Sequence, residues 1–259
     1  MSTVAFVTGA SSGFGRGLAL RLAARGFAVS LAARRVERLE EVAEEVRAAG
    51  GRPLVCPCDV AERPQVLEAV ARTRDELGPV DLLFANAGVD WPTYPDELDG
   101  REVAAMLAVN FLGAVYATEA VLPSMLERDS GRISVVGSLA GYGGLPSTAA
   151  YGASKAAVDA FFESLRIDLR ETGVQVTIVT PGYVRTEMTE ENPFPMPFLM
   201  ELEPAVDRIE KAIFRGGRRV GFPFPLWIQT FLGQILPRWL YDILASGQDR
   251  DRRPDGGHR

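Results

Sequence analysis

A glycine-rich turn joins an apolar strand to a helical segment near the start of the chain. The strand is expected over Val4 to Thr8, and the helical pattern runs from Leu18 to Gly26. Glycines let the backbone approach a pyrophosphate closely, and the helix start offers unpaired N–H groups and a positive dipole end to that anion. The spacing Gly-x-x-x-Gly-x-Gly differs from the more common Gly-x-Gly-x-x-Gly, and the alternative is a tight turn without a ligand. The segment predicts a dinucleotide site at Gly9, Ser11, Ser12, Gly13, Phe14 and Gly15.

The end of the second expected strand, Phe27 to Ala33, bears on which dinucleotide is bound. A free ribose 2′-hydroxyl usually meets an acidic residue roughly 20 positions past the glycines. Here Ala33 is followed by Arg34 and Arg35. Two guanidinium groups can hold a 2′-phosphate through paired N–H donors, and Ser12 can add a hydroxyl contact. The pattern favours NADP(H), with NAD(H) as the alternative; the two arginines could also merely begin the exposed face of the next helix.

Strands and helices alternate along most of the chain. Further strands are expected over 54–56, 80–85, 132–137, 174–179 and 218–222, and helices over 36–49, 62–77, 98–127, 147–172 and 204–215. This alternation predicts an α/β fold: a Rossmann-like, doubly wound, mostly seven-stranded parallel sheet with helices on both faces, in one domain over 1–247. The candidate residues lie just past strand carboxyl ends, where such sheets bind ligands.

Three side chains suited to proton transfer come from neighbouring segments. Tyr151 and Lys155 are four residues apart on an expected helix and so share a face, and Ser138 follows a strand. A tyrosine hydroxyl has a pKa of about 10, and an adjacent ammonium lowers it by favouring the phenolate. Ser138 can hydrogen-bond a substrate oxygen held between it and Tyr151. The set predicts proton transfer at an alcohol or carbonyl oxygen, although a Tyr-x-x-x-Lys pair alone also arises by chance.

Composition argues against several other classes of protein. The net charge is −6 and no long basic run occurs, which disfavours nucleic-acid binding. His258 is the single histidine, so a Ser-His-Asp hydrolase and a histidine-ligated metal site are not expected. Cys56 and Cys58 are too close for a Cys-x-x-Cys redox or metal pair, and the N-terminus lacks a signal-peptide pattern. A cytoplasmic location is therefore expected.

Taken together, the motifs resemble the short-chain dehydrogenase/reductase family in its compact single-domain form, over about residues 3 to 186. The resemblance rests on the turn Thr8 to Gly15 and on Asp59, Asn86-Ala87-Gly88, Asn110, Ser138, Tyr151, Lys155, Pro181-Gly182 and Thr186, in family-like order and separation.

The resemblance implies catalytic roles for four residues. Tyr151 would be the general acid in reduction and the general base in oxidation. Lys155 would hold the nicotinamide ribose hydroxyls and lower the proton affinity of Tyr151, and Ser138 would orient the substrate oxygen. Asn110, in a bent helix, would hold a water that links Lys155 to solvent. The structural alternatives are a buried, satisfied Asn110 and a Ser138 hydroxyl bonded to the backbone.

The resemblance also implies a cofactor cleft. Asp59 and Val60 would lie against the adenine, although Asp59 could instead cap the following turn. Further lining would come from two segments, the second beside the carboxamide: Asn86, Ala87 and Gly88, then Pro181, Gly182, Val184 and Thr186. The implied function is an NADP(H)-dependent, metal-free oxidoreductase, a homodimer or homotetramer, that acts on a small-molecule carbonyl or alcohol. The alternatives are an NAD(H)-preferring enzyme and a non-catalytic dinucleotide-binding sensor.

The segments after Thr186 are less regular. Residues 186–217 are expected to cover the substrate, and prolines at 193, 195 and 197 prevent a regular helix there. An apolar lining would predict a hydrophobic substrate, unless its side chains fill the core instead. The residues concerned are Phe194, Met196, Phe198, Leu199 and Met200.

An aromatic extension over 222–247 ends the predicted domain, and a polar tail over 248–259 is expected to be disordered. One helical face of the extension carries Ile228, Phe231, Leu232, Ile235 and Leu236. This stripe is expected first to dock on the fold, second to form a subunit contact, and third to rest on a membrane surface, because a membrane-surface helix normally carries more basic residues.

Overall fold

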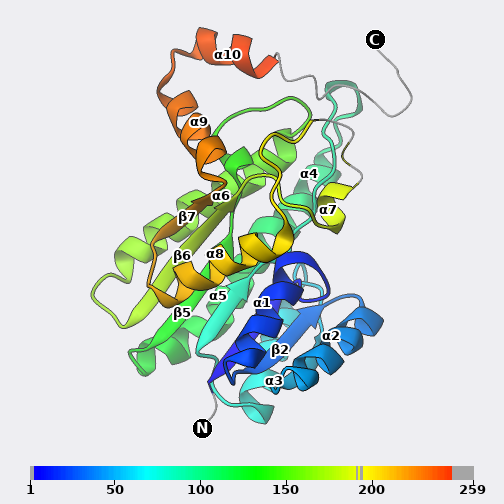
Figure 1. Ribbon diagram of the computed structural model, residues 1–259, viewed down its shortest axis with the longest axis vertical. Coiled ribbons are helices and arrows are strands. Elements are labelled where there is room, and N and C mark those ends of the chain that lie inside the picture. The colour runs from blue at the N-terminus through cyan, green and yellow to red at the C-terminus, as the bar shows by residue number, and fades with distance from the viewer. Residues whose placement is uncertain (1–2, 191, 193–194, 247–259) are drawn as a thin grey trace.

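The computed structural model describes residues 3–190, 192 and 195–246, which form one parallel sheet between two layers of helices (Figure 1). The sheet has seven strands, as predicted, and their order is β3-β2-β1-β4-β5-β6-β7. The strands are β1 (Val4–Thr8), β2 (Ala28–Ala33), β3 (Arg52–Pro57), β4 (Leu82–Ala85), β5 (Gly131–Val136), β6 (Val174–Pro181) and β7 (Arg219–Phe222). The helices are α1 (Gly13–Ala24), α2 (Val36–Ala48), α3 (Arg63–Glu76), α4 (Gly100–Leu107), α5 (Gly113–Glu127), α6 (Ala149–Asp168), α7 (Glu187–Glu190), α8 (Leu202–Phe214), α9 (Phe224–Ile235) and α10 (Arg238–Ser246).

Two apolar cores lie on opposite faces of the sheet. One joins the sheet to α1, α2 and α8, and its members include Leu18, Val42 and Ile209. The other joins the sheet to α3, α5 and α6, and it includes Val121 and Phe162. Every residue of β1, β2 and β4 is buried. Strands covered on both faces need a continuous apolar run rather than an alternating one, which is the pattern seen in the sequence.

The strand order reverses between β1 and β4. β1 pairs with both β2 and β4, so that Val7 lies opposite Leu31 on one side and Phe84 on the other. The connections that follow β1 and β4 therefore diverge at the carboxyl edge of the sheet. A crevice forms at such a switch point, and ligands of open α/β sheets bind there.

The helical run expected over 98–127 is interrupted by one turn of π-helix, η2 (Ala108–Leu112). Asn110 lies in this turn, and turns of this kind are frequent at functional sites. By length and mean hydropathy, the run Gly100–Glu127 could cross a membrane. Its buried residues Ala117, Val121 and Met125 belong to the core with α3 and α6, and 33% of its most apolar window is buried in the fold.

Among the described residues, the apolar side chains expected to line the substrate pocket lie elsewhere. Met200 forms a bridge with Val184 and packs against the core, as the structural alternative predicted. Phe198 is exposed, and no described residue of 195–200 lines the cleft described below. Phe194, like the tail with His258, lies outside the described residues.

The C-terminal extension contacts the fold through a different face from the expected one. A Cβ on Gly221 would lie 2.0 Å from the Trp227 ring, and one on Gly182 would lie 2.6 Å from Leu226, so these two side chains dock. The predicted stripe does not: Phe231 is 50% and Ile235 72% exposed. Docking of the stripe on its own fold is therefore wrong, because the helix presents its neighbouring face to the glycines. α9 and α10, orange to red in Figure 1, extend beyond the sheet.

Candidate active site

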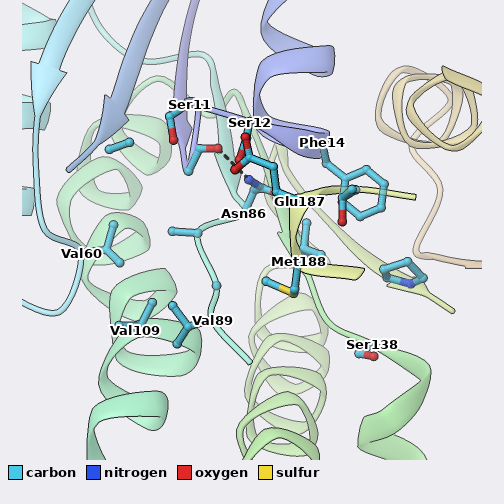
Figure 2. A pocket seen from close by; sticks show the side chains of 18 of the residues that line it. Ser11, Ser12, Phe14, Val60, Asn86, Val89, Val109, Ser138, Glu187 and Met188 are labelled. Atoms are coloured by element: carbon cyan, nitrogen blue, oxygen red, sulfur yellow. Dashed lines mark hydrogen bonds between the residues drawn. The ribbon is translucent and has the colours of Figure 1, made fainter. Parts of the chain in front are cut away.

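A cleft of about 300 Å³ opens at the switch point, and the predicted residues gather around it. Figure 2 shows Ser11 and Ser12 near one end, Ser138 at the other, and Asn86 and Glu187 between them. The predicted residues that line the cleft are Gly9, Ser11, Ser12, Gly13, Phe14, Arg34, Arg35, Asp59, Val60, Asn86, Ala87, Gly88, Ser138, Tyr151, Lys155, Pro181, Gly182, Val184 and Thr186. Gly15 and Asn110 are the predicted residues not among them.

The glycine turn is packed too closely for side chains. Gly9 has φ +64°, and a Cβ there would lie 2.7 Å from Nδ2 of Asn86. A Cβ on Gly15 would lie 2.2 Å from the carbonyl oxygen of Gly9, which explains why Gly15 supports the turn without lining the cleft. Asn86 Nδ2 donates to the carbonyl oxygens of Thr8 and Gly9 at 3.0 and 3.3 Å. The amide thereby joins the turn to the segment after β4.

The start of α1 fits an anion. Ser12 occupies the N-cap position with extended backbone, and its side chain makes no capping hydrogen bond. The first N–H groups of α1 thus lack the side-chain partner that a cap would supply, and they face the cleft together with the positive end of the helix dipole. This arrangement suits the pyrophosphate of a dinucleotide.

Exposed charges surround the end of the cleft beyond β2. Arg35 Nη2 donates to the hydroxyls of Ser11 and Ser12 at 3.1 and 3.0 Å and pairs with Glu187 at 2.9 Å. Arg34 Nη1 lies 3.9 Å from Oδ2 of Asp59. Arg35 is also the N-cap residue of α2, so the arginines both begin this helix and line the cleft.

Asp59 combines the two predicted possibilities. Its Oδ1 accepts a hydrogen bond from the backbone N–H of Ala61 at 3.0 Å, which is the turn cap. The residue nevertheless lines the cleft beside Val60.

The buried end of the cleft holds the three proton-transfer candidates. Ser138 follows β5, and its Oγ accepts a hydrogen bond from the Ala140 N–H at 3.1 Å at the start of the short helix η3 (Leu139–Tyr142). Tyr151 and Lys155 lie one turn apart on α6, and the Lys155 Nζ is 5.7 Å from the centre of the Tyr151 ring. Lys155 is 4% exposed, and its Nζ donates to the Val136 carbonyl oxygen at 2.9 Å.

Burial dominates the electrostatics at this end. It raises the pKa of the Tyr151 hydroxyl; the charge of Asp90 raises this pKa further, and a hydrogen bond with Ser138 opposes the rise. Burial also lowers the pKa of Lys155 to about 8, against the opposing charges of Asp159 and Asp90. The expected net lowering of the Tyr151 pKa by Lys155 is therefore wrong, because loss of hydration outweighs the favourable interactions.

Asn110 is buried and its side chain is bonded to protein groups. Nδ2 donates to the Val89 carbonyl and to Ser154 Oγ at 2.9 Å each, and Oδ1 accepts from the Val89 N–H at 2.8 Å. Ser154 Oγ in turn donates to the Tyr151 carbonyl at 2.7 Å. The side chain thus fits the structural alternative: it links the π-helical turn to the helix that carries Tyr151.

Several lining residues escaped the sequence analysis. Val89 directly follows the predicted Asn86-Ala87-Gly88, and continuing that motif by one residue would have found it. Glu187, Met188 and Thr189 lie within the segment 186–217 that was expected to cover the substrate, but they were not named as lining residues. The remaining missed lining residues are Ala33, Cys58, Val109, Val136 and Gly137.

Comparisons with known proteins agree with this geometry. The family model described as short chain dehydrogenase matches residues 3–194. A protein of Myxococcus xanthus, described as an uncharacterized oxidoreductase, is 46% identical over 241 residues, which cover 93% of this chain and 95% of that protein.

Two solved structures share the architecture. A short-chain dehydrogenase/reductase from Burkholderia phymatum in complex with NAD has a TM-score of 0.83 at 24% identity, and the match covers 97% of each chain. A single-substitution variant of actinorhodin polyketide ketoreductase with NADPH has a TM-score of 0.78 at 29% identity, over 87% of this chain and 97% of that one.

Proposed function

The chain belongs to the short-chain dehydrogenase family, and from this premise we propose that it is an NADP(H)-dependent oxidoreductase acting on a carbonyl or alcohol. The family and its relatives support an oxidoreductase that uses a nicotinamide dinucleotide as its cofactor. One observation carries the finer proposal. A single cleft has phosphate-type donors at one end and Ser138, Tyr151 and Lys155 at the other.

The residues present fit the dinucleotide. The uncapped start of α1 suits the pyrophosphate, and Arg34 and Arg35 offer guanidinium donors for a 2′-phosphate. Lys155 would hold the ribose near the nicotinamide. When bound, the cofactor donates or accepts the hydride.

The protein's part in the reaction is to handle the proton. Since burial keeps the Tyr151 hydroxyl protonated near neutral pH, Tyr151 is set to donate its proton to the substrate oxygen in reduction. Ser138 would hydrogen-bond the same oxygen and fix its direction. The buried Lys155 ammonium, with a pKa of about 8, stabilises the phenolate left behind.

The direct test is a screen of carbonyl and alcohol compounds while nicotinamide absorbance is followed. We expect turnover with at least one hydrophobic ketone, aldehyde or alcohol, because the cleft has apolar lining residues such as Val89, Val109 and Met188. Faster turnover of small polar carbonyls would contradict the substrate class. Tight dinucleotide binding without any turnover would favour the sensor.

NADP(H) preference has its own measurement. We expect a higher kcat/KM with NADPH than with NADH on the same substrate. Equal values would remove the role proposed for Arg34 and Arg35 and favour NAD(H).

Assembly and location complete the proposal. We expect a homodimer or homotetramer, because the exposed apolar side chains of α9 and α10 offer a contact surface. Light scattering after gel filtration would measure the mass, and a monomer would contradict this. A cytoplasmic location is supported by the two free cysteines, Cys56 and Cys58.

A further inference from the structure

A buried carboxylate lies one helical turn behind the proposed catalytic lysine. Asp159 follows Lys155 by four positions on α6, so the two share a face of that helix. Its side chain is 13% exposed. Oδ1 is buried and accepts no hydrogen bond from any residue that the structure describes. A buried, partly unpaired carboxylate is costly, and its presence calls for an explanation.

The carboxylate is pressed against the strand end that leads to Ser138. A Cβ on Gly137 would lie 2.9 Å from Asp159 Oδ1, so the carboxylate packs closely against this position. The preceding residue, Val136, accepts the hydrogen bond of Lys155 through its carbonyl oxygen. Asp159 and Lys155 therefore contact adjacent residues of the same short segment.

Arg219 on β7 holds the carboxylate. Its Nη1 donates to Asp159 Oδ2 at 3.2 Å and to the Tyr142 hydroxyl, and its Nη2 lies 3.6 Å from Glu163. Tyr142 ends η3, the short helix that Ser138 begins. The guanidinium thus connects α6, β7 and the turn after β5, all behind the reaction end.

Titratable groups from three elements face Asp159 near Lys155. Asp159 faces Lys155 and Glu163 from α6, Arg219 from β7 and Tyr142 from η3. Burial raises the Asp159 pKa to about 6, and Arg219 opposes the rise, so the carboxyl group is mostly charged at neutral pH.

Two carboxylates affect the pKa of Lys155. Asp159 and Asp90 both raise its pKa against the effect of burial. Asp90 is exposed in the segment after β4, whereas Asp159 is largely buried and held by an arginine. A charge in a less hydrated site acts more strongly.

We propose that Asp159, held by Arg219, is a positioning residue that keeps Lys155 in its charged form beside Tyr151. This inference rests on the catalytic role proposed for Lys155. The ionisation of Lys155 can, however, be measured without any turnover, so failure of one proposal can be told from failure of the other.

The sequence makes the measurement simple, since it contains only two lysines, Lys155 and Lys211. A Lys211→Arg protein with 13C at the lysine ε-carbons would show one lysine signal, and its chemical shift against pH gives the midpoint of Lys155. In the Asp159→Asn variant of this protein we expect the midpoint to fall by about one pH unit. Glu163→Gln is the matched control, because it removes a carboxylate from the same arginine, and it should not lower the midpoint.

Two further measurements guard against a variant that fails to fold. In the protein that retains Asp159, the Lys155 signal should show a second, smaller inflection near pH 6, where the carboxyl group titrates. Arg219→Gln should move this inflection to higher pH, because Asp159 then loses its cation and binds a proton more readily. A midpoint unmoved in Asp159→Asn, or no inflection near pH 6, would overturn the proposal.

Activity supplies a second readout. The alkaline limb of the kcat/KM profile should move to lower pH in Asp159→Asn by the same interval as the Lys155 midpoint. A uniform loss of kcat/KM at all pH values would instead indicate a merely structural role and contradict the proposal.

Discussion

The two ends of the cleft use charge in opposite ways. At the end beside Ser11 and Ser12, the side chains of Arg35 and Glu187 are 47% and 52% exposed and form an ion pair. At the reaction end Lys155 is buried, and its pKa is displaced to about 8. Exposed charges are screened by salt and exchange partners at little cost, whereas buried charges carry shifted pKa values. Cofactor selection should therefore respond to salt, and chemistry to pH.

The largest effect should come from the buried end, through Tyr151→Phe. Removing the proton donor should lower kcat by roughly 10²- to 10⁴-fold. Dinucleotide affinity, measured by NADPH fluorescence, should stay within a few-fold. Tyr116→Phe, at a half-buried tyrosine of α5 away from the cleft, is the control. A Tyr151→Phe enzyme with normal kcat would remove the basis of the proposed reaction.

Comparison with Lys155→Met should show that the contribution of Lys155 to stability rises with pH while the activity of the wild type falls. Between the folded pKa of about 8 and the ordinary value of 10.5, the unfolded chain binds more protons than the folded one, so the contribution of Lys155 to folding stability rises with pH. The unfolding free energy of wild type minus that of Lys155→Met should therefore increase by about 3 kcal/mol across this interval. Wild-type activity should fall over the same interval. Denaturant unfolding at several pH values measures the first trend, and a constant difference would contradict it.

At the exposed end, Arg35→Ala should lower kcat/KM for NADPH by about 10- to 100-fold, the value of a lost charge-assisted hydrogen bond. The same parameter for NADH should change little. Arg38→Ala, on the same helix and paired with Glu41, is the control. Equal losses with both cofactors would show that Arg35 supports the turn without selecting a 2′-phosphate.

The smallest effect should come from Glu187→Gln. The carboxylate competes for the Arg35 donors that a 2′-phosphate needs, so its removal should tighten NADPH binding. The gain should be only a few-fold, because exposed ion pairs contribute about 0–1 kcal/mol. It should shrink as salt is added. Weaker NADPH binding would mean that Glu187 positions Arg35 instead of competing for it.

The sequence predicted the sheet and the cleft because both depend on local patterns. Apolar runs such as Val4–Thr8 identify buried parallel strands, and residues just past their ends, such as Ser138, converge once the strands are parallel. Most site elements therefore lay beside a recognisable strand, whereas Tyr151 and Lys155 were found by their spacing on α6, and the topology brought them together.

What escaped prediction depends on contacts distant in sequence. Arg219 meets Asp159 only because β7 joins the edge of β6 beside α6. The raised pKa of Tyr151 reflects its burial, which the Tyr-x-x-x-Lys spacing does not reveal. The helix predicted from the C-terminal stripe forms, but a neighbouring face of this helix docks on the fold. Trp227 packs against Gly221, and a glycine has no apolar side chain by which the sequence could reveal this contact.

The C-terminal extension is fastened to the same turn that begins at Ser138. Gln234 Nε2 donates to the Tyr142 carbonyl at 3.2 Å, and the Tyr241 hydroxyl donates to the Gly144 carbonyl at 2.9 Å. A change in the last two helices would therefore reach the turn after Ser138 first, while the glycine turn at the other end of the cleft makes no hydrogen bond with them among the described residues.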